Sequence, residues 1–137
     1  MSKAKTICFA LMDPPFEASR TTTALRAIDA ALRLGVNVNV FAYEGAVMLP
    51  FRHQQPHSNP VHGRDTQEED HPLPREWVAG LIRTASERGL NFEWVNCGMC
   101  VDERGAGDAI DGILRGAPAD LWRLASASDN TLIVPTA

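Results

Sequence analysis

An alternation of apolar, strand-like runs with amphipathic helical segments is the feature that most restricts the fold of this chain. Thr6–Leu11 is a continuous apolar run, as expected of a strand that is buried on both faces. Ser19–Leu34 places apolar residues at helical spacing, with Ser19 as the expected N-cap, and Val36–Tyr43 alternates like a second strand. A strand, a helix and a strand in succession predict a parallel pair of strands.

The second half of the chain continues the same alternation. Its predicted elements are a helix that begins at Pro74 and ends at Gly89, a strand at Asn91–Asn96, a helix at Pro118–Ser126 and a strand at Thr131–Val134. Ala106–Gly116 shows no single periodicity, and Trp77, Trp94 and Trp122 are spaced like core residues. We therefore predict an α/β fold: a three-layer sandwich with a central, mostly parallel sheet, similar to flavodoxin.

The length and charge of the chain are those of an ordinary globular domain. Its 137 residues carry 13 basic and 17 acidic side chains, a net charge of −4, and we expect one domain over residues 1–137. The absence of a basic block predicts no nucleic-acid partner. No apolar run approaches the ~20 residues that span a bilayer. Because Thr6–Leu11 is also too short for a signal-peptide core, we expect no membrane partner and a cytoplasmic protein.

Residues 44–74 form an excursion from the alternating pattern. The segment contains all four histidines, His53, His57, His62 and His71, and five of the nine prolines. Its apolar start, Gly45–Phe51, predicts a short helix or strand, after which no period is visible. We expect the excursion to cover a site or a neighbouring subunit.

The motif Cys97-Gly-Met-Cys100 follows directly on a predicted strand. The carboxyl edge of a parallel sheet is where ligands bind in open α/β folds. The chain has three cysteines, an odd number, which does not make a disulfide framework and instead favours redox, sulfur or metal chemistry at this motif. Cys8 lies inside an apolar strand and is expected to be structural.

The thiolate is the reactive form of cysteine, so groups that favour an anion matter most at this motif. A helical turn that starts near Gly98 would favour an anion on Cys97. Arg104 follows about two helical turns later and could reach back over the same pocket. A persulfide is also an anion near neutral pH, so the same groups would stabilise it.

Other uses of the motif fit the sequence less well. A c-type haem site needs histidine where Val101 stands. A zinc site needs further ligands, and only His53 and His57 have a compact ligand spacing, although both precede the cysteines. Neither a GxGxxG nucleotide motif nor a P-loop is present. We therefore expect no cofactor and no metal.

Four matches along nearly the whole chain point to a known family: Asp13-Pro14 after the first strand, Leu34-Gly35 at the end of the first helix, Glu44-Gly45 after the second strand, and Cys97-x-x-Cys100-x-x-x-Arg104-Gly105. In these features the chain resembles the DsrE/DsrF-like family, which includes the TusD-type subunits of bacterial sulfur relays. In such members a strand-end cysteine is followed eight residues later by glycine, usually after arginine, as Cys97 is by Gly105.

The resemblance implies a parallel α/β sandwich, a homo-oligomer of trimer or hexamer type, and a cysteine persulfide that passes between sulfur donor and acceptor proteins. On this basis Cys97 is expected to accept the sulfur, Cys100 to act as resolving or auxiliary thiol, and Arg104 to favour the anionic form. Two alternatives stay open: a non-catalytic oligomer subunit or regulatory binding module of the same fold, and a dithiol redox protein.

Overall fold

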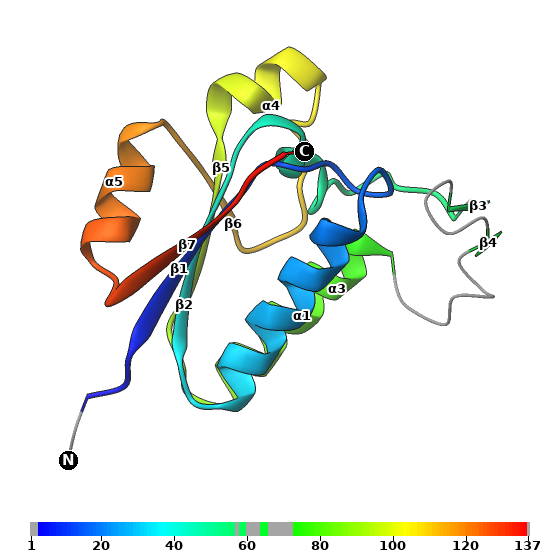
Figure 1. The fold of residues 1–137 in the computed structure, drawn as a ribbon. Coiled ribbons are helices and arrows are strands. Elements are labelled where there is room, and N and C mark those ends of the chain that lie inside the picture. Colours follow the sequence, from blue (N-terminus) through cyan, green and yellow to red (C-terminus); the bar gives the residue numbers. More distant parts are fainter. Residues whose placement is uncertain (1–2, 57, 60–63, 66–72, 137) are drawn as a thin grey trace.

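The structure is a computed structural model that describes residues 3–56, 58–59, 64–65 and 73–136 (Figure 1). Three of the four histidines of the excursion, His57, His62 and His71, lie outside the described residues, as does the acidic run at 68–70.

Within the described residues, the main sheet has five strands in the order β6-β5-β2-β1-β7. The strands are β1 (Thr6–Leu11), β2 (Asn37–Ala42), β5 (Phe92–Cys97), β6 (Ile113–Gly116) and β7 (Asn130–Val134). Each neighbouring pair in this sheet is parallel, so all five carboxyl ends meet at one edge. Two short antiparallel strands, β3 (Ser58–Asn59) and β4 (Arg64–Asp65), lie in the excursion.

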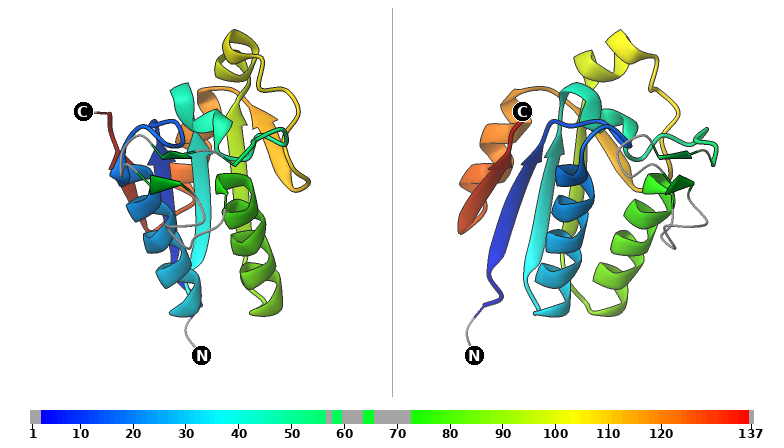
Figure 2. Two further views of the ribbon diagram at one scale, coloured as in Figure 1. Left: turned by 90° about the vertical axis from the view of Figure 1, so that its right-hand side faces the viewer. Right: turned by 45° about the vertical axis from the view of Figure 1, so that its right-hand side comes forward.

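Helices cover both faces of the sheet and its carboxyl edge. They are α1 (Ser19–Arg33), the 3-10 helix η1 (Glu44–Met48), α3 (Pro74–Glu87), α4 (Gly98–Arg104) and α5 (Ala119–Ser126). Figure 2 shows α1 and α3 side by side on one face, and Figure 1 shows α5 on the other. The predicted three-layer α/β sandwich with a parallel sheet is confirmed.

Two hydrophobic clusters hold these layers together. The larger one fills the space between the sheet and the α1–α3 layer, and Trp94 is buried at its centre. The other contains Leu124 of α5 together with Cys8, Cys97 and Cys100. Both motif cysteines thus belong to the hydrophobic layer on the α5 side.

Several local predictions need correction. Ser19 is not the N-cap of α1, because Ala18 occupies the cap with an extended backbone and gives no side-chain cap. The segment without clear periodicity contains the edge strand β6, which is only four residues long and largely exposed. By contrast, the prediction of a short helix or strand at the apolar start of the excursion is confirmed, because Glu44–Met48 forms η1.

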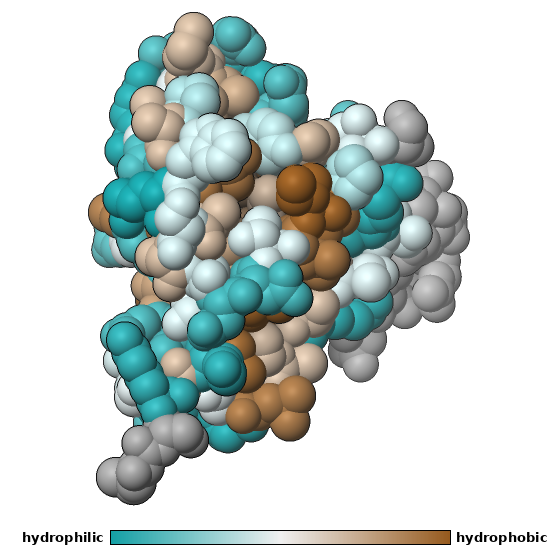
Figure 3. All heavy atoms as spheres, turned by 60° about the vertical axis from the view of Figure 1, so that its left-hand side comes forward, coloured by the Kyte–Doolittle hydropathy of each residue, from teal (hydrophilic) through white to brown (hydrophobic). Residues whose placement is uncertain are grey.

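Trp122 was expected in the core, and this prediction is wrong. Its side chain is 77% exposed, since α5 turns Leu124 toward the sheet and Trp122 away from it. Leu132 and Ile133 of β7 are exposed too. Figure 3, with this side of the molecule turned forward, shows hydrophobic side chains in brown at the surface among polar ones.

Candidate functional site

Cys97 is the last residue of β5, an interior strand with β2 on one side and β6 on the other. Helix α4 begins at the next residue, Gly98, as the sequence predicts. The Cys97 side chain is only 4% exposed and belongs to the cluster on the α5 side. The predicted position at the carboxyl end of a sheet strand is confirmed, and the thiol lies below the surface.

Cys100 lies one helical turn further along α4 and is 8% exposed. The backbone N–H of Glu44, the first residue of η1, donates a hydrogen bond to Sγ of Cys100 at 3.1 Å. The start of the excursion therefore covers the site, as expected from the sequence. Glu44 reaches this position with φ of 52°, in the left-handed region that non-glycine residues rarely adopt.

The two thiols interact, and the surroundings separate their roles. Burial raises the pKa of Cys100 above its ordinary value, and the hydrogen bond from Glu44 N–H opposes this. The hydrogen bond to Cys97 and its negative charge raise the pKa of Cys100 further. The raised pKa favours the protonated form of Cys100, whose thiol is in hydrogen-bonding contact with Cys97. Cys8, whose pKa is also raised by burial, belongs to the same hydrophobic cluster but lies inside strand β1.

Arg104 contacts the Cys100 side of the site. Its Nη1 donates to the carbonyl oxygen of Cys100 at 3.4 Å, and Nη2 forms an ion pair with Glu44 at 3.2 Å. Glu103 is a further ion-pair partner at 3.5 Å. Among the described residues, none of the hydrogen bonds or ion pairs of Arg104 involves the thiol of Cys97. Arg104 therefore acts on the site by holding Glu44 against Cys100.

The cation beside Cys97 is Arg115, which sequence reasoning missed. Arg115 lies on β6 opposite Asn96, and Gly116 lies opposite Cys97. Its guanidinium forms two hydrogen bonds with Asp102 of α4, at 3.0 and 2.7 Å. No sequence motif predicts that Arg115 lies near Cys97. Its position depends on the pairing of β6 with β5, and β6 has no distinct period in the sequence.

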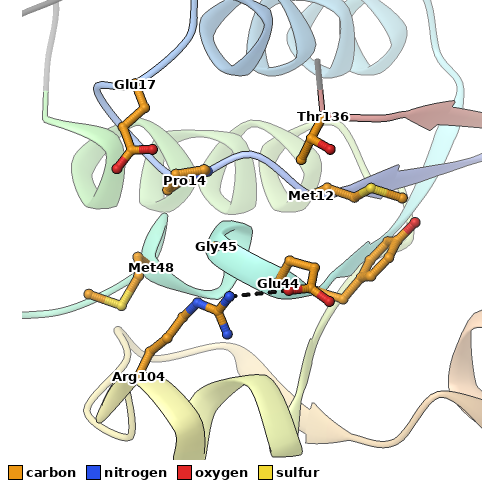
Figure 4. Close-up of a pocket in the computed structure, with 9 residues that line it drawn as sticks. Met12, Pro14, Glu17, Glu44, Gly45, Met48, Arg104 and Thr136 are labelled. Atoms are coloured by element: carbon orange, nitrogen blue, oxygen red, sulfur yellow. Dashed lines mark hydrogen bonds and ion pairs between the residues drawn. The ribbon is translucent and has the colours of Figure 1, made fainter.

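A cavity of about 780 Å³ adjoins the Cys100 side (Figure 4). Its lining includes Pro14, Tyr43, Glu44 and Arg104, and Figure 4 shows the ion pair between Glu44 and Arg104 at its wall. Burial and then the charge of Glu44 raise the pKa of Tyr43, so its hydroxyl stays protonated and can donate. A cavity of this size with a few polar groups suits a small ligand or a protein tail.

The histidine that the structure describes is engaged away from the motif. His53 pairs with Asp108, which also binds Arg52 at 3.2 Å. Among residues 3–56, 58–59, 64–65 and 73–136, no group of three or more histidine, cysteine or acidic side chains could hold a metal ion. Nor does any described helix have the length and apolar character needed to cross a membrane.

Comparison with known proteins identifies the family. The sequence profile of the DsrE/DsrF-like family matches residues 5–133. The chain belongs to the DsrE/DsrF-like family. Membership indicates a sulfur-relay role in general and sulfur-relay partners in general. A search of curated proteins found no match.

A solved structure supports the fold independently. The YchN protein from E. coli superposes with a TM-score of 0.68 over 96% of this chain and 100% of that chain. The two sequences are 18% identical, so this likeness concerns the fold alone. The family match and the fold agree with the resemblance seen in the sequence.

Proposed function

We propose that this protein is a sulfur carrier that takes sulfane sulfur as a persulfide on Cys97 and passes it to a partner protein. The observation that carries the proposal is the contact between two thiols with different surroundings at the carboxyl end of β5. Cys100 keeps its proton, because burial and the neighbouring Cys97 raise its pKa. In this proposal Cys97, at the carboxyl end of β5, is the nucleophile, and its thiolate is the reactive form.

The loading step is a thiol exchange. The Cys97 thiolate attacks the outer sulfur of a donor persulfide, the sulfur–sulfur bond of the donor breaks, and the donor leaves as a thiolate. Cys97 then carries the additional sulfur. In the transfer step an acceptor thiolate attacks that outer sulfur and Cys97 leaves as a thiolate, so no external oxidant or reductant is needed.

Cys100 offers a second way to release the sulfur. Cys100 gives its proton to the outer sulfur of the anionic Cys97 persulfide as its own sulfur attacks the inner one, which expels hydrosulfide and leaves a Cys97–Cys100 disulfide. A dithiol reductant must then supply two electrons to restore both thiols. In this proposal Arg104 favours the anionic form of Cys100 by holding Glu44, whose backbone N–H donates to Sγ of Cys100.

The partners in this proposal are a sulfur donor protein, an acceptor protein and further copies of the chain, in the cytoplasm. Exposed apolar side chains on α5 and β7, Trp122, Leu132 and Ile133, support assembly into a trimer or hexamer. Light scattering at micromolar concentration should show an assembly well above the 15.0 kDa of one chain. A monomer at every concentration would exclude a stable oligomer.

Intact-protein mass spectrometry after incubation with a persulfide donor tests the proposal. The expected product is an adduct of about 32 Da that reductant removes. Cys97→Ser should abolish the adduct, whereas Cys100→Ser should retain it and slow its release. Loss of the adduct in Cys100→Ser alone would reverse the assignment, and no adduct in any form would exclude a carrier.

A dithiol redox protein is the second candidate, and the contact between the two free thiols favours it. The same experiment separates the two functions. A redox protein should lose about 2 Da on oxidation and form no sulfur adduct. A non-catalytic subunit should show neither change under conditions in which an unrelated free thiol reacts.

A further inference from the structure

Arg115 approaches the Cys97 end of α4 closely enough to leave no room for a side chain at Gly98. A Cβ atom at Gly98 would lie 2.8 Å from Nε of Arg115 and 3.0 Å from the carbonyl oxygen of Gly116. Gly98 directly follows Cys97, and Gly116 is the β6 partner of Cys97. The guanidinium therefore lies over the backbone that carries the thiol.

Asp102 fixes the orientation of Arg115. The carboxylate accepts one hydrogen bond from each terminal nitrogen of the guanidinium, at 3.0 and 2.7 Å, in a two-point geometry. These bonds occupy the outer edge of the fork. Within the described residues Nε of Arg115 has no hydrogen-bond acceptor, and it is the nitrogen that faces Gly98.

The electrostatics agree with this geometry. The hydrogen bond and the charge of Asp102 raise the pKa of Arg115, and the negative charge of ionised Cys97 adds to the increase. The other charged or titratable groups around the site are Cys100 and Arg104 on α4, Glu44 on η1, and Asp120 on α5, whose carboxylate lies against Gly116. Both cations are paired, Arg104 with two glutamates and Arg115 with Asp102, but Arg115 is the one whose Nε lies against Gly98, next to Cys97.

We propose that Arg115 donates from Nε to the anionic sulfur of Cys97, first as the thiolate and then as the outer sulfur of its persulfide. Asp102 is the positioning residue that aims Arg115, and Gly98 leaves the space for it. The role toward the thiolate rests on the approach of Nε to Gly98, next to Cys97, whereas the role toward the persulfide rests on the proposed sulfur-carrier function.

Alkylation of the protein without any sulfur donor tests the thiolate part. The rate of Cys97 modification by iodoacetamide is followed by peptide mass spectrometry across pH, in a Cys100→Ser background that leaves one thiol in the motif. Arg115→Gln should slow Cys97 alkylation at pH 7 by about 3- to 10-fold and move the pH profile toward alkaline pH. Arg115→Lys keeps the charge but not the two-point bond to Asp102. Cys97 alkylation in this variant should therefore be slower than in the Cys100→Ser parent and faster than in Arg115→Gln.

Two further variants control the comparison. Arg33→Gln removes an equally exposed arginine whose partner is Asp29 of α1, and it should leave the Cys97 profile unchanged. Asp102→Asn should slow Cys97 alkylation less than Arg115→Gln does, because the guanidinium remains but is held less firmly in its orientation. The proposal is overturned if Arg115→Gln and Arg33→Gln give the same profile, or if Arg104→Gln slows Cys97 more than Arg115→Gln.

The persulfide part is read from a separate measurement. In a preparation that carries the sulfur adduct, Arg115→Gln should shorten the lifetime of the adduct at pH 7 relative to Arg33→Gln. Failure to load any variant would exclude the sulfur-carrier function while the alkylation profiles still decide the role of Arg115. An unchanged lifetime in a loaded Arg115→Gln protein would exclude the persulfide role specifically.

Discussion

The two cysteines of one short motif lie in different chemical surroundings. Cys97 ends a strand and is followed by Gly98, against which lies the guanidinium of Arg115 that Asp102 holds in place. Cys100 lies under a backbone N–H of Glu44, next to a cavity, in a setting that raises its pKa. A CxxC motif is therefore not a symmetrical pair, because different neighbouring elements contact its two cysteines.

The largest effect that separates the two surroundings should come from Gly98→Ala. The new Cβ would collide with the fixed guanidinium of Arg115 and with the backbone oxygen of Gly116. We expect a loss of about 1–2 kcal/mol in the free energy of unfolding, measured by urea denaturation, and slower Cys97 alkylation. Gly107→Ala, at a position with open space around it, is the matched control and should be neutral. Equal stability of both variants would contradict the close approach.

Gly45→Ala disturbs the other side of the comparison. Its Cβ would lie 2.8 Å from two ring atoms of Pro14, which belongs to a loop and can partly give way. We expect a cost of about 1 kcal/mol and a displaced Glu44. Because the N–H of Glu44 lowers the pKa of Cys100, its loss should move Cys100 alkylation toward alkaline pH. A shift at Cys97 instead of Cys100 would show that the two surroundings are not independent.

Glu44→Gln should change Cys100 in the opposite direction. The substitution keeps the backbone N–H but removes a negative charge that raises the pKa of Cys100. Cys100 alkylation at pH 8, measured in a Cys97→Ser background, should become about twofold faster. Glu103→Gln removes the other ion-pair partner of Arg104 and should have a smaller effect. A slower reaction in Glu44→Gln would mean that its backbone contact, not its charge, dominates.

The smallest effect concerns stability against pH. The pKa of Cys100 is raised in the folded state. The protonated thiol therefore contributes to the free energy of unfolding, and this contribution is fully present below the pKa of an unfolded thiol, about 8.5. This contribution is lost as pH rises from there through the folded value, because the unfolded chain then releases the proton first. The urea midpoint of the parent should fall more steeply above pH 8.5 than that of Cys100→Ser. Parallel curves would contradict the raised pKa.

The sequence predicted the frame of the site better than its details. Buried parallel strands are continuous apolar runs, which is why β1 and the strand end at Cys97 could be located from the residues alone. Strand β6 is short and exposed at the edge of the sheet, so it leaves little periodic signal. Missing β6 meant missing Arg115, since only its pairing with β5 brings this residue to Cys97.

Arg104 shows a second limit of reading along one helix. The sequence places it two turns after Cys97, and this spacing alone suggested a contact with that thiol. The structure turns its guanidinium toward Glu44, which arrives from 60 positions away in the chain. The prediction that Trp122 lies in the core was wrong for a related reason. Amphipathic spacing within a short helix does not determine which of its side chains face the sheet.

The position of β7 has a consequence for how the chain reaches its fold. This strand pairs with β1, and the N–H of Thr6 donates to Asp129 across 123 positions in sequence. During synthesis the outer edge of β1 therefore waits, unpaired, until almost every other described element has been made. Such distant pairing is entropically slow, and an open apolar strand edge can pair with another chain in the meantime. The time between the synthesis of β1 and the arrival of β7 is thus the interval in which this protein is most exposed to misassembly.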